Sequence, residues 1–234
     1  MSPPPPLTRT RDHPAVRQAL AVGLATGAYG VSCGALGVAA GLSVWQTVLT
    51  SLLVFSGGSQ FAFFGVIGAG GTPAAAVATS GLLGVRNGIY GLQVVQLLGV
   101  RGWRRLLAAH WTIDESTAVA IGQPDLRAAR LGFWVTGATI FTLWNLTTLA
   151  GALAGEAMGD PRTYGLDAAA AAAFVALLWP RLQGRDPLAT AAVAVLLTVL
   201  IAPVAPPGVP VLVAATAALA VGVLRMRRTS VLTP

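Results

Sequence analysis

One arginine stands alone in a long apolar part of this sequence. Between Gln18 and Val100, Arg86 is the only residue with a formal charge. An arginine at the centre of a membrane helix costs about 2.5–3.5 kcal/mol, so such residues usually face a cavity, a partner or an anion. Its guanidinium is suited to hold a carboxylate. The alternative is a structural arginine held by backbone carbonyls that Gly84 and Gly88 leave free.

Further polar positions belong to the same candidate site. Asn87 follows the arginine, and Tyr90 lies four positions after it, on the same face of a helix. In the preceding apolar segment, exposed glycine amides suit an anionic group at a half-helix N-terminus. Ordinary hydrogen bonding between helices is the alternative for each residue taken alone. The predicted substrate-binding residues are Arg86, Asn87, Tyr90, Ser56, Gly57, Gly58, Ser59, Gln60 and Asn145.

Two adjacent carboxylates, Asp114 and Glu115, are the candidates for coupling or gating. Thr112 precedes Glu115 by three positions, which matches a capping box and would explain Glu115 structurally. Asp114 then remains for ion pairing or proton coupling. A hydrolase triad of His110, Asp114 and Ser116 would need the fold to bring them together. We expect no enzyme, because every acidic residue lies outside the apolar segments or at their edges.

The composition predicts an integral membrane protein. Of the 234 residues, 55% are apolar and 10% are charged, whereas a soluble domain has about 25% charged residues. Most apolar segments reach the length of a membrane-spanning helix. There are seven of them, at 18–41, 44–69, 73–99, 131–154, 166–180, 187–203 and 209–224.

The residue types that are missing exclude several functions. The sequence has no lysine, which excludes a phosphate-binding loop of the usual kind and a Schiff-base lysine. With Cys33 as the only cysteine and two histidines, it predicts no internal disulfide, no metal site and no cofactor. The net charge of +7 does not indicate nucleic-acid binding, because the arginines lie at the ends of apolar segments.

The arginine clusters predict how the segments cross. They lie at 9–17, 101–130, 181–185 and 225–228, and arginines favour the cytoplasmic side. All four clusters share that side if the first 100 residues cross an even number of times. One segment between 44 and 99 is then broken or re-entrant, and the glycine-rich stretches at 56–59, 68–73 and 84–88 mark where. Seven complete crossings are the alternative.

The predicted fold is therefore an all-α, polytopic transmembrane protein with six to seven apolar segments, at least one of them broken or re-entrant between 44 and 99. Residues 1–17 form a polar cytoplasmic tail. Residues 18–225 form a single transport domain with a polar loop at 101–130. Residues 226–234 form a second cytoplasmic tail.

The first helix carries a stripe of glycines. They are spaced by three or four positions, so they share one helical face, and small residues let membrane helices approach closely. The stripe either packs within this chain or forms the docking surface for a partner subunit. Its members are Gly23, Gly27, Gly30, Gly34, Gly37 and Gly41.

Three parts of the sequence together resemble the AzlC family, the large subunits of two-component branched-chain amino acid exporters. They are Leu52–Phe61 (LLVFSGGSQF), Arg86 with Tyr90-Gly91-Leu92, and Asp114-Glu115-Ser116. The resemblance runs from about 18 to 200 and is strongest over 44–118. It implies export of leucine, isoleucine, valine or analogues across the bacterial cytoplasmic (inner) membrane, driven by an ion gradient of protons. It also implies a small multi-spanning AzlD-type partner.

The chain departs from the family at one informative place. Where the family has Asn-x-Arg-His, this sequence has Gly84-Val85-Arg86-Asn87, so the arginine matches and its polar neighbours do not. Substrate choice or proton transfer is expected to differ accordingly. Arg86 is expected to hold the substrate carboxylate, with Phe55 and Phe61 near the aliphatic side chain. The alternative is a transporter of another small carboxylate, or an assembly subunit that is not self-sufficient.

Overall fold

The computed structural model describes residues 13–159, 175, 178–179, 182–216 and 220–221. Within these ranges the chain is helical and has no strand, which confirms the all-α class. The predicted apolar segment 166–180 lies mostly outside the described residues, as do most of tail 1–17 and all of tail 226–234. Of the last segment, residues 209–216 and 220–221 are helical.

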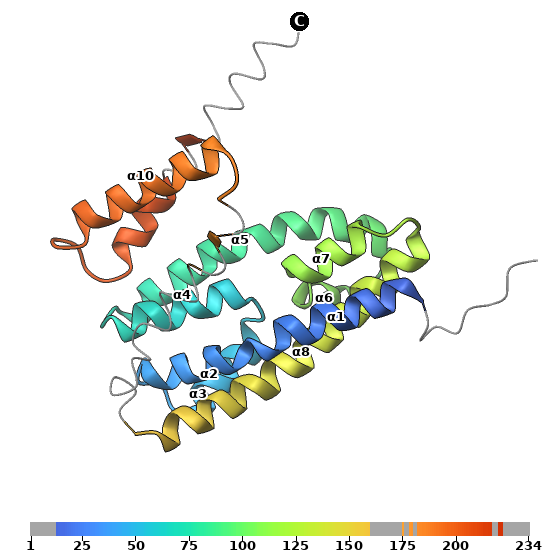
Figure 1. Cartoon of the computed structure of the whole chain (residues 1–234), viewed down its shortest axis with the longest axis horizontal. Helices are drawn as coiled ribbons and strands as arrows, with labels where there is room; N and C mark the ends of the chain where they lie inside the picture. Colours follow the sequence, from blue (N-terminus) through green and yellow to red (C-terminus); the bar gives the residue numbers. More distant parts are fainter. Residues whose placement is uncertain (1–12, 160–174, 176–177, 180–181, 217–219, 222–234) are drawn as a thin grey trace, which may run out of the picture.

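The first long element is a rod of two helices, α1 (Pro14–Ala28) and α2 (Gly30–Ala39), with a break at Tyr29. It begins inside the predicted tail, because His13 Nδ1 accepts a hydrogen bond from the Ala15 amide at 3.2 Å. A proline in the first turn, Pro14, also favours a helix start. The long helix α8 (Leu126–Ala157) packs along both halves of the rod (Figure 1).

By length and composition, two helical stretches within the described residues are suited to cross a membrane: 14–39 and 126–157. Helix α5 (Pro73–Leu98) has 26 residues but is not one of these two stretches, and it carries Arg86 and Asn87 at its middle. These helices support a membrane protein. The count of six to seven crossings stays a prediction.

The second apolar segment is broken, as the glycine-rich stretch at 56–59 predicted. It forms α3 (Val44–Leu53) and α4 (Gly57–Gly68), which have 10 and 12 residues. At 1.5 Å per residue neither is long enough to cross a bilayer core of about 30 Å. Helix α3 follows α2 directly, and α4 ends where a Cβ on Gly68 would lie 3.3 Å from Ala40 Cβ. The two arms therefore form a helical hairpin that returns to its starting end, with its tip at 54–56.

Helix α5 runs back along the molecule without a break at Gly84 or Gly88. At its end, the Leu97 carbonyl accepts a hydrogen bond from Arg130 Nε at 2.9 Å, and Gln123 Nε2 donates to Gln18 Oε1 at 2.9 Å. The start of α1, the end of α5 and the start of α8 therefore lie together. We call this the basic end, and it includes Arg17, Arg101, Arg104, Arg105, Arg127 and Arg130. The arrangement agrees with an even number of passes in the first 100 residues.

The predicted polar loop at 101–130 is instead folded into a second hairpin. It contains α6 (Trp103–His110), α7 (Asp114–Ile121) and the first turn of α8. Ser116 Oγ closes the tip at 111–113, because it accepts from the Ile113 amide at 3.1 Å and donates to the Trp111 carbonyl at 2.6 Å. A core of Val94, Leu98, Ala108, Ala120 and Phe133 holds the hairpin against α5 and α8.

The predicted capping box of Thr112 and Glu115 is wrong. Helix α7 begins at Asp114 with Ile113 at the cap position. The Thr112 hydroxyl donates backwards to the Ala108 carbonyl at 2.7 Å, so it is committed to the end of α6. Glu115 instead lies in the first turn of α7, where a negative charge favours the helix start.

A long helix followed by a helical hairpin thus occurs twice, and Pro14 and Pro73 begin the two long helices. The first hairpin enters from the end opposite the arginines and the second from the basic end. Their tips meet in the middle, where the rings of Phe55 and His110 lie 5.8 Å apart. Helix α10 (Arg185–Ile201), which has no buried residue, stands apart from these elements in Figure 1.

The glycine stripe of the first rod packs within the chain, so the predicted docking surface is corrected. A Cβ on Gly34 would collide with the Thr148 carbonyl of α8, and one on Gly37 would collide with Thr47 of α3. Gly41 differs, because it lies in the turn after α2 with φ 92° and has nothing within 4 Å. The five glycines that are buried, and therefore closed to a partner, are Gly23, Gly27, Gly30, Gly34 and Gly37.

Candidate functional site

A central cavity of about 570 Å³ lies where the two hairpin tips meet. Its polar wall comes from α4, α5 and α7. Its apolar wall comes from the break between α1 and α2, from α4, α5 and α8, from both hairpin tips and from Leu178. The polar wall consists of Ser56, Gly57, Gly58, Arg86, Asp114 and Glu115. The apolar wall includes Tyr29, Phe55, Phe61, Leu83, Ile113, Ile140, Trp144 and Leu178.

Arg86 and Asp114 form an ion pair at the polar wall. Arg86 Nη1 lies 3.2 Å from Asp114 Oδ2, and the side chains are 32% and 19% exposed. A Cβ on Gly58 would lie 3.0 Å from Arg86 Nη2, so the missing side chain lets the guanidinium rest against the first turn of α4. Arg86 Nε is buried without a hydrogen bond to any described residue. The guanidinium thus keeps capacity for an additional acceptor.

The polar wall has a positive and a negative part. At the start of α4, the Ser56 side chain makes no capping bond, and the first amides of a helix have no partner within it. Arg86 and this helix start therefore place positive charge on one side. On the other side, Asp114 and Glu115 occupy the first turn of α7. A molecule with both an anionic and a cationic group fits this arrangement.

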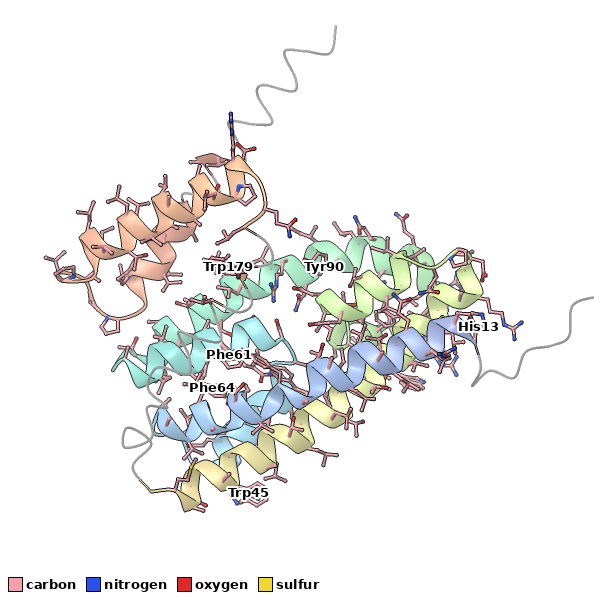
Figure 2. All side chains as sticks on the ribbon, viewed as in Figure 1. His13, Trp45, Phe61, Phe64, Tyr90 and Trp179 are labelled. Atoms are coloured by element: carbon pink, nitrogen blue, oxygen red, sulfur yellow. The ribbon has the colours of Figure 1, made fainter. Side chains whose placement is uncertain are left out.

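The apolar wall is built from aromatic rings that hold one another in place. Tyr29 and Phe61 have ring centroids 5.7 Å apart, and Phe61 meets Trp144 edge-on at 6.4 Å. Figure 2 shows Phe61 and Phe64 reaching from α4 toward the α1–α2 rod. Such a surface stabilises an aliphatic group by removing it from water, by about 25 cal/mol per Å² buried.

Gln60, predicted to bind substrate, has a positioning role instead. Its side chain is fully buried and does not line the central cavity. Its Nε2 donates to the carbonyls of Ser51 and Val54 at the helix break, and the Val54 carbonyl also accepts from the Ser56 amide at 2.8 Å. Its Oε1 accepts from Trp144 Nε1 at 3.0 Å and from Cys33 Sγ at 3.1 Å. Gln60 therefore fixes the first hairpin tip to α2 and α8.

Four other predicted residues lie away from the central cavity. Asn87 and Ser59 line a second cavity behind the first hairpin tip. Asn145 donates to the Phe141 carbonyl at 2.7 Å, within α8. Tyr90 borders neither of these two cavities. The structure therefore joins Arg86 with Ser56, Gly57, Gly58, Asp114 and Glu115, and separates the other predicted residues from it.

Sequence reasoning did not single out Tyr29 or Ile140 for the site. Tyr29 is a polar residue inside an apolar segment, which is a weak signal, and it lies at the break between α1 and α2. Ile140 and Trp144 belong to α8 and reach the cavity only through tertiary packing.

The three residues of the conceivable hydrolase triad do not assemble. The Ser116 hydroxyl donates to a backbone carbonyl, and the His110 ring packs between Phe55 at 5.8 Å and Phe141 at 5.7 Å. His110 also borders the second cavity, whereas Asp114 borders the central one. No group of three His, Cys, Asp or Glu residues suited to a metal ion occurs within the described residues.

Comparison with known proteins gives one result. A family model described as AzlC protein matches residues 21–158. This range contains both hairpins, α5, α8 and most of the α1–α2 rod. It therefore contains every residue that lines the central cavity except Leu178. No curated protein and no solved structure matches the chain.

Proposed function

The chain belongs to the AzlC family, a family of membrane transport proteins, and on this premise we propose that it exports branched-chain amino acids as one subunit of a transporter. The central cavity is the proposed substrate site. The observation that carries the proposal is the ion pair of Arg86 and Asp114, placed between two helix starts and facing an aromatic wall.

The proposed binding mode follows the charges of the cavity. The substrate carboxylate binds Arg86 and the amides at the start of α4, where the positive charge is concentrated. The substrate ammonium group binds Asp114 and Glu115. The branched side chain lies against Tyr29, Phe61 and Trp144, and burying it favours leucine, isoleucine and valine over small polar amino acids.

The same cavity offers a means of coupling to protons. It contains one arginine and two carboxylates, so it carries a net negative charge when both carboxylates are ionised. A zwitterionic substrate does not change that charge, whereas one proton neutralises it. We propose that a proton exchanges with the amino acid at this site and that the proton gradient drives export.

The architecture supports a secondary transporter that spans the bacterial cytoplasmic membrane several times. In many such proteins two repeated units of opposite orientation place the starts of half-helices at a central site. Here α4 and α7 start at the central cavity from hairpins that enter from opposite ends. As in the family it belongs to, the chain is proposed to act with a small AzlD-type membrane partner.

The test is efflux of labelled leucine, isoleucine and valine from preloaded cells. Wild type, Arg86→Ala, Asp114→Asn and the exposed control Arg127→Ala are each co-expressed with the neighbouring small membrane protein at matched levels. We expect Arg127→Ala to match wild type and the two site variants to lose at least tenfold in rate. Equal efflux by all four would make the ion pair structural. No efflux by wild type would overturn the branched-chain assignment.

One observation favours a second candidate, a transporter of another small amphoteric carboxylate. Gly84 and Asn87 stand where the family has asparagine and histidine. Neither borders the central cavity in this chain. The same efflux assay with labelled methionine and other apolar amino acids separates the candidates. Rates above those for leucine would support the second.

A further inference from the structure

Two additional cavities lie along α5, the second behind the first hairpin tip and the third toward the basic end. The second measures about 360 Å³ and shares Phe55 and Ser56 with the central cavity. The third measures about 330 Å³ and shares Asn87 and Thr112 with the second. It ends beside Arg105 at the basic end. The three cavities therefore follow one another with shared walls across half the molecule.

Four glycines belong to the wall that α5 gives to these cavities. Gly81 and Gly84 border the second cavity, and Gly88 and Gly91 border the third. A Cβ on Gly81, Gly88 or Gly91 would meet nothing within 4 Å, and one on Gly84 would meet only Ser59 Oγ at 3.6 Å. Side chains at these positions would fill the space that the cavities occupy.

Polar atoms without partners point to water in the second cavity. Ser59 is 1% exposed, and its hydroxyl, directed toward Gly84, has no hydrogen bond to a described residue. Asn87 Oδ1 is also buried without a partner among these residues. A buried polar atom that bonds nothing costs about 1–3 kcal/mol. Both residues border the second cavity, which at about 360 Å³ has room for several water molecules, so water is the partner that satisfies both atoms.

Phe55 divides this space from the central cavity. Its ring is 6% exposed. It packs edge-on against Phe141 at 5.1 Å and at a tilt against His110 at 5.8 Å. It borders both the central and the second cavity. Its ring is therefore the partition between them.

We propose that the second and third cavities form an aqueous route along the glycine face of α5, from the basic end to the partition at Phe55. The route takes water and a small zwitterionic amino acid, and Arg105 at its mouth attracts the carboxylate. Its use rests on the proposed transport function, but its existence is tested separately.

The test is the water accessibility of single cysteines in the full chain with its partner. The native thiol is first replaced as Cys33→Ser, which keeps a donor for Gln60. Single variants Gly84→Cys, Gly88→Cys and Gly91→Cys are then compared with Val85→Cys and Ile89→Cys. The native side chains of these two controls are exposed (60% and 58%) but border none of these cavities. A membrane-impermeant methanethiosulfonate is added to membrane vesicles from either side, and labelling is read by mass.

We expect the glycine positions to react at least tenfold faster than the two controls, and only from the side of the basic end. Equal reactivity at all five positions would overturn the route. Unreactive cysteines at Gly88 and Gly91 would overturn it as well, because lipid or another helix would then cover the glycine face.

A second variant tests the partition. Leu83 borders the central cavity but not the second. We expect Leu83→Cys to react slowly from the basic side and at least fivefold faster when combined with Phe55→Ala. An unchanged rate would overturn the role given to Phe55.

The two proposals fail in distinguishable ways. Labelling needs no transported substrate. If the expected labelling pattern were found without leucine efflux, the route would be supported and the proposed substrate would be wrong. If leucine efflux were found but the cysteines at the glycine positions did not react, the transport function would be supported and the route would be wrong.

Discussion

The glycine face of the α1–α2 rod and the glycine face of α5 have the same spacing but different surroundings. On the rod, an added Cβ would collide with α8 or α3 at every buried glycine of the stripe. On α5, three of four such positions meet nothing within 4 Å. Small residues thus serve two purposes in one protein. On the rod they bring two backbones together, and on α5 they leave space beside a helix.

The surroundings explain the difference. The rod lies against α8, whose own Gly151 would collide with the Val31 carbonyl if it carried a Cβ, so the contact is close from both sides. Helix α5 faces the tips and arms of two short hairpins, and these leave the cavities bordered by Ser59 and Asn87. A long helix can follow a rod along its whole length, whereas short hairpins cannot.

The largest expected effect is that of Gly34→Ala. Its Cβ would overlap the Thr148 carbonyl and lie 2.7 Å from the Ala152 amide nitrogen, and backbone atoms cannot turn away. We expect a loss of about 3 kcal/mol in stability, seen as a lower melting temperature in detergent and a smaller monodisperse fraction. Gly81→Ala, from the open face, is the matched control. Equal melting temperatures for the two variants would remove the distinction between the faces.

Gly37→Ala is expected to destabilise less, and in a way that a second change repairs. Its Cβ would collide with the side chain of Thr47, which is fully buried. We expect a loss of about 2 kcal/mol that Thr47→Ala largely restores, because the colliding methyl and hydroxyl are then absent. The double-mutant cycle is measured by thermal unfolding. Strictly additive losses would show that the two residues do not meet.

Gly58 is intermediate between the closely packed glycines of the rod and the open glycines of α5. Gly58→Ala should therefore affect function rather than folding. Its Cβ would lie 3.0 Å from Arg86 Nη2, the mobile end of a side chain, so the guanidinium shifts by a few tenths of an ångström. We expect efflux to fall about three- to tenfold, or roughly 1 kcal/mol, with an unchanged melting temperature. Gly65→Ala on the same helix, which meets nothing within 4 Å, is the control. If Gly58→Ala kept the wild-type rate of efflux, the position of the Arg86 guanidinium would not matter for transport.

The smallest effect has the opposite sign. Gly88→Ala on α5 adds a methyl group in open space, and alanine favours a helix over glycine by up to about 1 kcal/mol. We expect a slightly higher melting temperature for the full chain. Marked destabilisation would mean that α5 is closely packed by another element, and the comparison between the two faces would fail.

Much of the fold was predictable, because membrane helices can be recognised by their apolar composition. The break in 44–69 was predicted from its glycines, and the start of α1 and the end of α5 lie at the same end, in agreement with the arginine pattern. The hairpin at 103–121 was missed, because a short polar stretch with Arg104, Arg105 and Asp114 resembles a loop. Its turn depends on Ser116, whereas the sequence pattern had indicated a capping box of Thr112 and Glu115 at this place.

For the candidate site, the sequence predicted the charged residues better than their neighbours. Arg86 and Asp114 stood out because charge is rare in this chain, and they form an ion pair. Gln60 and Asn145 looked alike as polar residues in apolar segments, yet one anchors a hairpin tip and the other bonds its own helix. Composition measures polarity, whereas the role of each amide depends on which carbonyls lie within reach.

By itself the sequence determined that the chain is helical, that its apolar segments suit a membrane, and where charge and glycine interrupt them. Only the tertiary structure decided which of two glycine faces closes and which stays open. Spacing of three and four residues places glycines on one side of a helix but does not specify what that side meets. That depends on the length and direction of the neighbouring elements, which contacts between distant parts of the chain establish.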